Sequence, residues 1–164
     1  MSIPLRVVPW LYGECSFYAV VYDEKCLVDE FLDRLAGVDR DHADALFNFL
    51  HMAAREPYVR EAYLRSERPE LGIYAMYNHK EVEPSVYNPS RLLCSYVGGS
   101  NRIMLLGPGF MKTKDESIQS NVSANSHAQF LANVATMLNR RIDEGEILIV
   151  GSELIPRHYD SLDF

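Results

Sequence analysis

The sequence predicts an α+β fold, in which an N-terminal strand and a helical hairpin pack on a small antiparallel sheet of about 4–5 strands and a C-terminal helix follows. A run of β-branched and aromatic residues at 15–22 indicates the first strand, and two apolar stripes of helical period follow it between residues 23 and 57. Further apolar runs at 71–77 and 91–106 indicate more strands. Two amphipathic helices that follow a strand need a sheet to cover, and these later runs supply it.

The first strand is predicted over residues 15–22, with the sequence CSFYAVVY. Alternation puts Phe17 and Ala19 on one face, and Tyr18 and Val20 on the other. The preceding segment, residues 1–14, contains two prolines that cannot donate ladder hydrogen bonds. We therefore expect an irregular or edge-pairing extension there, without chemistry of its own.

A helical hairpin is predicted next. The first helix opens at Asp23 and ends at Gly37 as its C-cap. The second begins at Asp39 or Asp41 and ends before Pro57. Its apolar stripe comprises Ala43, Leu46, Phe47, Leu50 and Ala54. Residues 58–69 fit either a short helix or a loop.

The later strands contain a hairpin around a glycine turn. A strand at 71–77 precedes a long loop at 78–90. Two further strands are joined by a turn at 98–101, and the second ends in a break at 107–109, Gly-Pro-Gly.

The C-terminal helix is predicted after a polar loop at 115–125. Ser126 and Gln129 have the spacing of a capping box, and Gly145 ends the helix. Residues 146–150 are expected to form one more strand, and the remainder an acidic tail. We expect one domain over 1–164, with a core at about 15–142, an N-terminal extension at 1–14 and a tail at 145–164.

Composition places the chain among ordinary globular proteins, because 48% of its 164 residues are apolar and 24% are charged. The apolar runs are far shorter than the roughly 20 residues that a transmembrane helix needs, and no signal-peptide pattern opens the chain. We therefore expect a cytoplasmic protein. Three widely spaced cysteines and five histidines without ligand spacing predict neither a disulfide framework nor a metal site, and no cofactor motif is present.

The net charge of −7 is unevenly distributed. Residues 23–44 are mainly acidic, whereas residues 91–142 contain most of the later basic side chains. A cation set of Arg91, Lys112 and Lys114, with Arg102 beside it, could meet across a hairpin and hold a phosphate. The alternative, which spacing alone favours, is that these cations are ordinary solvated ends of a hairpin.

The element order resembles that of the RelE/HigB superfamily of type II toxins, particularly its phage-derived HigB-like branch. Four segments carry the resemblance: FLDRLAGVDRDHADAL at 31–46, ELGIYAMY at 70–77, RLLCSYV at 91–97 and NRIMLLGPGFMKTKD at 101–115. The family's arginine at a strand start, phenylalanine at a strand end and following lysines match Arg91, Phe110, Lys112 and Lys114.

The resemblance implies a ribosome-dependent mRNA endoribonuclease that needs no metal and is held in check by a small helix-turn-helix antitoxin. In that reading Arg91 stabilises the phosphorane charge, and Lys112 and Lys114 hold the RNA backbone or stabilise charge. Arg102 adds an RNA contact. Tyr96 and His127 are the candidate proton carriers, although each is also an ordinary packed residue of its element.

Two alternatives to the nuclease remain open: a nonenzymatic interaction module on the same fold, and a phage-derived protein that has lost the catalytic site. A homodimer is a further expectation. The discriminating feature is convergence, because a nuclease needs Arg91, Lys112 and Lys114 on one concave, solvent-open surface with Phe110 beneath it in the core.

Overall fold

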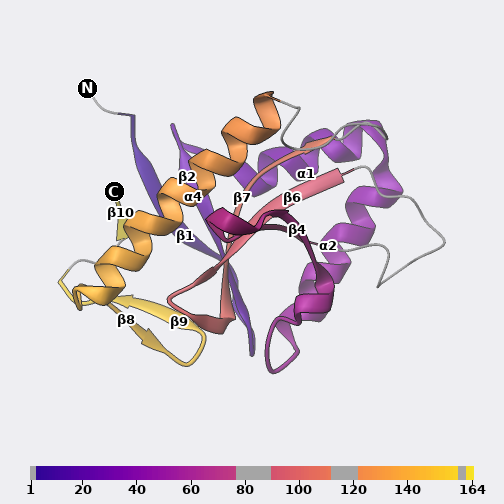
Figure 1. The fold of residues 1–164 in the computed structure, drawn as a ribbon. Helices are drawn as coiled ribbons and strands as arrows, with labels where there is room; N and C mark the ends of the chain where they lie inside the picture. Colours follow the sequence, from indigo (N-terminus) through magenta and orange to yellow (C-terminus); the bar gives the residue numbers. More distant parts are fainter. Residues whose placement is uncertain (1–2, 77–89, 112–121, 159–161) are drawn as a thin grey trace.

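A mixed eight-stranded β-sheet forms the middle layer of the protein (Figure 1). The computed structural model describes residues 3–76, 90–111, 122–158 and 162–164. From one edge to the other the strands are β10 (Leu162–Asp163), β1 (Leu5–Leu11), β2 (Ser16–Tyr22), β7 (Ser100–Met111), β6 (Ser90–Val97), β5 (Ile73–Met76) and β4 (Leu64–Arg68), and the short β3 (Lys25–Cys26) pairs with β2.

The α+β class is confirmed, but the predicted sheet of about 4–5 antiparallel strands is too small. The N-terminal extension contributes β1, the ambiguous stretch at 58–69 contributes β4, and the C-terminal tail contributes β10. The sheet is also not purely antiparallel, because β2 runs parallel to β7, with Ser16 opposite Ile103 and Ala19 opposite Leu106.

Strand β2 is buried on both faces. Phe17 and Ala19 belong to the core cluster on one side of the sheet, and Tyr18 and Val20 to the cluster on the other side, as the alternation predicts. Every residue from 16 to 21 is buried. A layer must therefore cover each face of the sheet.

Helices α1 (Leu27–Val38) and α2 (Arg40–Ala54) cover the first face. Helix α1 starts later than predicted, because Asp23 and Glu24 adopt left-handed φ angles of 51° and 63° in the turn between β2 and β3. Gly37 is not a C-cap, since it lies inside α1. Asp39 is the N-cap of α2, and its carboxylate accepts a hydrogen bond from the backbone N–H of His42.

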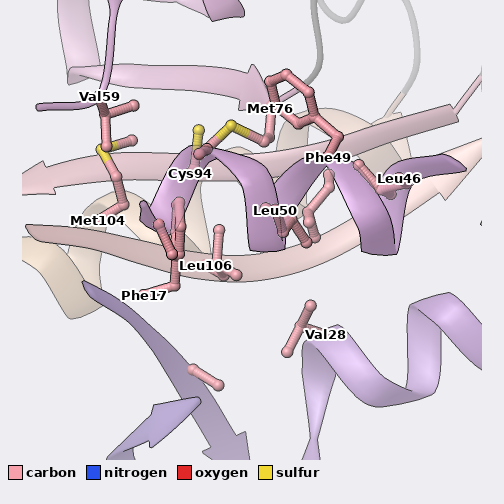
Figure 2. Close-up of a cluster of buried hydrophobic side chains, with 14 of the residues drawn as sticks. Phe17, Val28, Leu46, Phe49, Leu50, Val59, Met76, Cys94, Met104 and Leu106 are labelled. Carbon is pink, nitrogen blue, oxygen red and sulfur yellow. The ribbon is translucent and has the colours of Figure 1, made fainter. Parts of the chain in front are cut away.

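The core beneath these helices is shown in Figure 2. Leu46, Phe49 and Leu50 of α2 belong to the same buried cluster as Met76 and Leu106 of the sheet. Phe47 was expected on the buried stripe, but 44% of its surface is exposed, and Phe49 is buried in its place. Helix α2 therefore carries an aromatic side chain on its outer surface.

Helix α4 (Val122–Asp143) runs across the second face, with the hairpin of β8 (Ile147–Val150) and β9 (Glu153–Pro156) at its C-terminal end (Figure 1). The predicted capping box at Ser126 is wrong, because α4 begins at Val122 and Ser126 lies in its first turns. The strand predicted at 146–150 is confirmed as β8. The residues after it are not a simple tail, since they form β9 and β10.

The short connecting elements complete the fold. Two 3-10 helices, Glu61–Tyr63 and Pro69–Leu71, flank β4. Among the described residues, no helix is both long enough and apolar enough to cross a membrane.

The Gly-Pro-Gly sequence at 107–109 does not break the strand, because β7 continues through it to Met111 with a register shift opposite β6. The glycines let helices approach the strand from both layers. A Cβ atom at Gly107 would lie 2.7 Å from Leu131 of α4, and one at Gly109 would lie 2.4 Å from the ring of Phe31 of α1. Helix packing, and not chain reversal, requires glycine here.

Two glycine substitutions test this packing. We expect Gly109→Ala to lower the free energy of unfolding by about 1–3 kcal/mol, because the new methyl group overlaps the Phe31 ring. Gly37→Ala is the matched control. Gly37 lies in α1 with open space around it, so the change to alanine should raise the free energy of unfolding by roughly 0.5–1 kcal/mol. Urea unfolding measures both, and equal effects would contradict this description of the strand.

Candidate functional site

Arg91, the central residue of the predicted site, is buried in an ion pair. Its Nε lies 3.3 Å from Oε1 of Glu67 on β4, and the two side chains are only 5% and 3% exposed. The Arg91 guanidinium also donates to the backbone carbonyl of Ser90. Arg65 adds a second, longer ion pair to Glu67 at 3.7 Å. Arg91 therefore faces a carboxylate that lies between two arginines.

The expectation that Arg91 faces a solvent-open surface is wrong. By strand alternation, Arg91 points to the opposite face from Leu92 and Cys94, which belong to the core under α1 and α2. Helix α4 covers that opposite face. Phe110 lies opposite Arg91 in the register and is partly buried against the core under α4.

Arg102 does not lie beside Arg91. It is near the β6–β7 turn, whereas Arg91 pairs with Phe110 at the far end of the hairpin. The strand between Arg102 and Phe110 spans roughly 25 Å at the usual rise per residue. Arg102 donates from Nε to the backbone carbonyl of Glu14, and its terminal nitrogen lies 3.7 Å from the Glu14 carboxylate.

Lys112 and Lys114, the remaining predicted cations, lie outside the described residues. The described part of β7 ends at Met111, which pairs with Ser90. Convergence of the two lysines with Arg91 therefore stays a prediction.

Tyr96 borders a cavity of about 570 Å³. The other walls come from the segment at 58–61 and from the β6–β7 turn. The Tyr96 hydroxyl donates to the backbone carbonyl of Val59 at 2.9 Å. Burial, with the nearby Glu61 carboxylate as the next cause, raises the pKa of Tyr96 to about 12. The phenol is therefore fully protonated near neutral pH, and its hydroxyl hydrogen is donated to the Val59 carbonyl.

His127 does not share a site with Tyr96. It belongs to α4 and is partly buried, whereas Tyr96 packs against the core under α1 and α2. Burial lowers the pKa of His127 below its usual value, and the positive charge of Arg34 lowers it further. The imidazole is therefore mainly neutral at pH 7. The two predicted proton carriers belong to different layers of the fold.

A cluster of one exposed ring, Phe47, and two partly buried rings, Trp10 and His51, was missed by sequence reasoning. The ring centroids of Phe47 and His51 lie 4.3 Å apart, and Trp10 of β1 lies 6.1 Å from Phe47 in an edge-to-face arrangement. The indole N–H of Trp10 donates to the carboxylate of Asp29 on α1 at 2.8 Å. The sequence signal was a surplus of apolar residues around α2, which exceeds what one buried stripe needs.

Metal-binding geometry is lacking in the part of the chain that the structure describes, where no group of three or more His, Cys, Asp or Glu side chains could hold an ion. The groups described there are a buried ion pair, a protonated tyrosine and a partly exposed cluster of aromatic rings near a carboxylate.

A double-substitution cycle tests the buried pair. Glu67→Gln should lower the free energy of unfolding by about 3–5 kcal/mol, because it removes the carboxylate that faces the buried guanidinium. Glu67→Leu combined with Arg91→Met should lower the free energy of unfolding by less than the sum of the losses from Glu67→Leu alone and Arg91→Met alone. Asp44→Asn, which breaks the exposed ion pair with Arg40, is the control and should have little effect. Additive losses in urea unfolding would contradict the coupling.

The pH dependence of Tyr96 gives a second test. Since its pKa is raised in the folded state, the unfolded chain loses this proton near pH 10 and the folded chain near pH 12. Tyr96 therefore stabilises the fold below pH 10, and that contribution falls as the pH rises from about 10 to 12. Subtracting the ultraviolet absorbance titration of Tyr96→Phe from that of the wild type should reveal a phenol with a pKa of about 12. A difference curve centred near 10 would contradict the burial of Tyr96.

The comparisons with known proteins add no assignment. No protein-family model matches the chain, and searches of curated proteins and of solved structures give no match. The function therefore has to be inferred from the ion pair, the cavity and the aromatic cluster.

Proposed function

We propose that this chain is a nonenzymatic interaction module acting in the cytoplasm, with the predicted catalytic arginine serving the fold. The observation that carries the proposal is the buried pair between Arg91 and Glu67, both less than a tenth exposed. An arginine that stabilises a phosphorane must reach the substrate phosphate with its guanidinium. Here that group faces a carboxylate inside the protein.

The energy of opening this pair supports the proposal. Taking Arg91 away from the buried Glu67 carboxylate costs about 3–5 kcal/mol. This cost would slow a reaction that needs the freed guanidinium by roughly a hundred- to five-thousand-fold. An enzyme gains from a catalytic group that is already placed for reaction, whereas a structural ion pair gains from staying closed.

The proton carriers support the same conclusion. A general acid or base works best with a pKa near the operating pH. The pKa of Tyr96 is raised to about 12, and the pKa of His127 is lowered by burial. Tyr96 and His127 also belong to different layers. The two groups are therefore suited to packing and not to a shared proton relay.

The RelE/HigB-like endoribonuclease remains a second candidate, with a cognate antitoxin, the ribosome and mRNA as its partners. One observation favours it: a strand, a helical hairpin, further antiparallel strands and a later helix follow one another in the chain, although four strands, β4 to β7, stand where the resemblance has three. In this reading Arg91, Lys112 and Lys114 would act on RNA after the pair with Glu67 has opened.

Induced expression in bacteria separates the two functions. We expect the wild-type chain neither to arrest growth nor to produce ribosome-dependent cuts in mRNA, because Arg91 is held by Glu67. The measurements are growth after induction, translation rate and mapping of mRNA ends. Lys112→Ala is the comparison variant, since it leaves the buried pair in place.

A different result would favour the nuclease. If the wild type arrests growth and cuts mRNA on the ribosome, and Lys112→Ala abolishes both effects, the interaction-module proposal is wrong. Similar behaviour of both chains, without cleavage, supports it.

A further inference from the structure

A groove runs between the outer surfaces of α1 and α2, and it has an apolar floor. Leu32 and Ala36 of α1, with Ala43 and Phe47 of α2, line a hollow of about 190 Å³. Phe47 connects this hollow to Trp10 and His51, because its ring contacts both. The hollow and the three rings together are named the aromatic groove.

Carboxylates border the aromatic groove. Asp33 and Asp44 are exposed and line the hollow. Asp29, also exposed, accepts the hydrogen bond of the Trp10 indole at the end where the rings lie. Arg40 is the basic residue that lines the hollow, and its ion pair with Asp44 is long, at 3.8 Å, and open to solvent. The border is therefore negative overall, and the exposed ion pair between Arg40 and Asp44, which lies along α2, is weak.

We propose that the aromatic groove binds a basic peptide segment of a partner protein. The segment places an apolar side chain in the hollow, against Phe47, and its Lys or Arg side chains against Asp29, Asp33 and Asp44. This inference rests on the proposed function as an interaction module and names the class of its partner.

Charge complementarity selects this occupant. The groove lies in the acidic stretch of the chain, residues 23–44, so a nucleic acid or an anionic membrane surface would be repelled. A cationic side chain gains twice, since it meets carboxylates and can also lie over the face of Trp10 or Phe47. Tryptophan is among the residues enriched in protein-binding hot spots, and Trp10 lies beside Phe47 at one end of the groove.

Trp10 provides a direct measurement, because the chain contains one tryptophan. The probe is a short amphipathic peptide of lysine and leucine, titrated into the full chain while the emission of Trp10 is recorded. We expect a saturable change in emission that weakens as salt is added. The same peptide with glutamate in place of lysine should give no change.

Matched variants locate the binding. Phe47→Ala, and separately Asp33→Asn with Asp44→Asn, should each weaken binding of the lysine peptide by about tenfold or more. All three side chains are exposed, so these changes should leave the fold intact. The controls are Ile155→Ala, an exposed apolar residue of β9, and Asp143→Asn with Glu144→Gln at the end of α4. Both control variants should bind as the wild type does.

Three outcomes would overturn the inference: no saturable change in Trp10 emission, equal response to the glutamate peptide, or equal weakening by the control variants. These outcomes are separable from failure of the proposed function. Cleavage of mRNA by the wild type would refute the nonenzymatic module but leave the Trp10 titration unchanged. No saturable change in Trp10 emission, together with no mRNA cleavage, would refute peptide binding at the aromatic groove and leave the proposed function standing.

Discussion

The parallel pairing of β2 with β7 is the constraint on which the rest of the structure depends. Two parallel neighbours cannot be joined by a tight turn, so the chain between them must leave the sheet and return. Helices α1 and α2 with strands β4 to β6 make up that connection. Because β2 is apolar on both faces, each face also needs a cover. Helices α1 and α2 supply one cover, and α4 supplies the other.

This two-sided cover determines what Arg91 can do. An arginine on a sheet face that is open to water could meet a phosphate, but the face that carries Arg91 lies under α4. A buried guanidinium needs a partner carboxylate, and Glu67 supplies it from the edge strand. The positive charge that looks available in the sequence therefore contributes to linking β6 to the edge strand β4, across the intervening β5. The exposed side chains that could bind a partner lie instead on the outer surfaces of α1 and α2.

Local patterns were enough to predict β2, α2 with a start at Asp39 or Asp41, and the turn between β6 and β7, because each depends on residues close together in the sequence. The sheet edges were not predictable in this way. Strand β4, with the sequence LRSER, has no apolar alternation and is a strand because β5 pairs with it. Since Glu67 lies in that stretch, the burial of Arg91 could not be foreseen. Phe47 was misplaced because α2 has more apolar residues than its buried stripe holds.

The pairing of β2 with β7 also sets the order of events during synthesis. Ala19 is opposite Leu106, so the ribosome must add roughly 90 residues before β2 can meet its central partner, which takes about 4–20 s at usual elongation rates. Over that interval β2 can pair with β1 and β3, but its parallel neighbour β7 has not yet been made. Contacts between distant residues also slow folding itself. The nascent chain is therefore the form of this protein most exposed to aggregation and most in need of a chaperone.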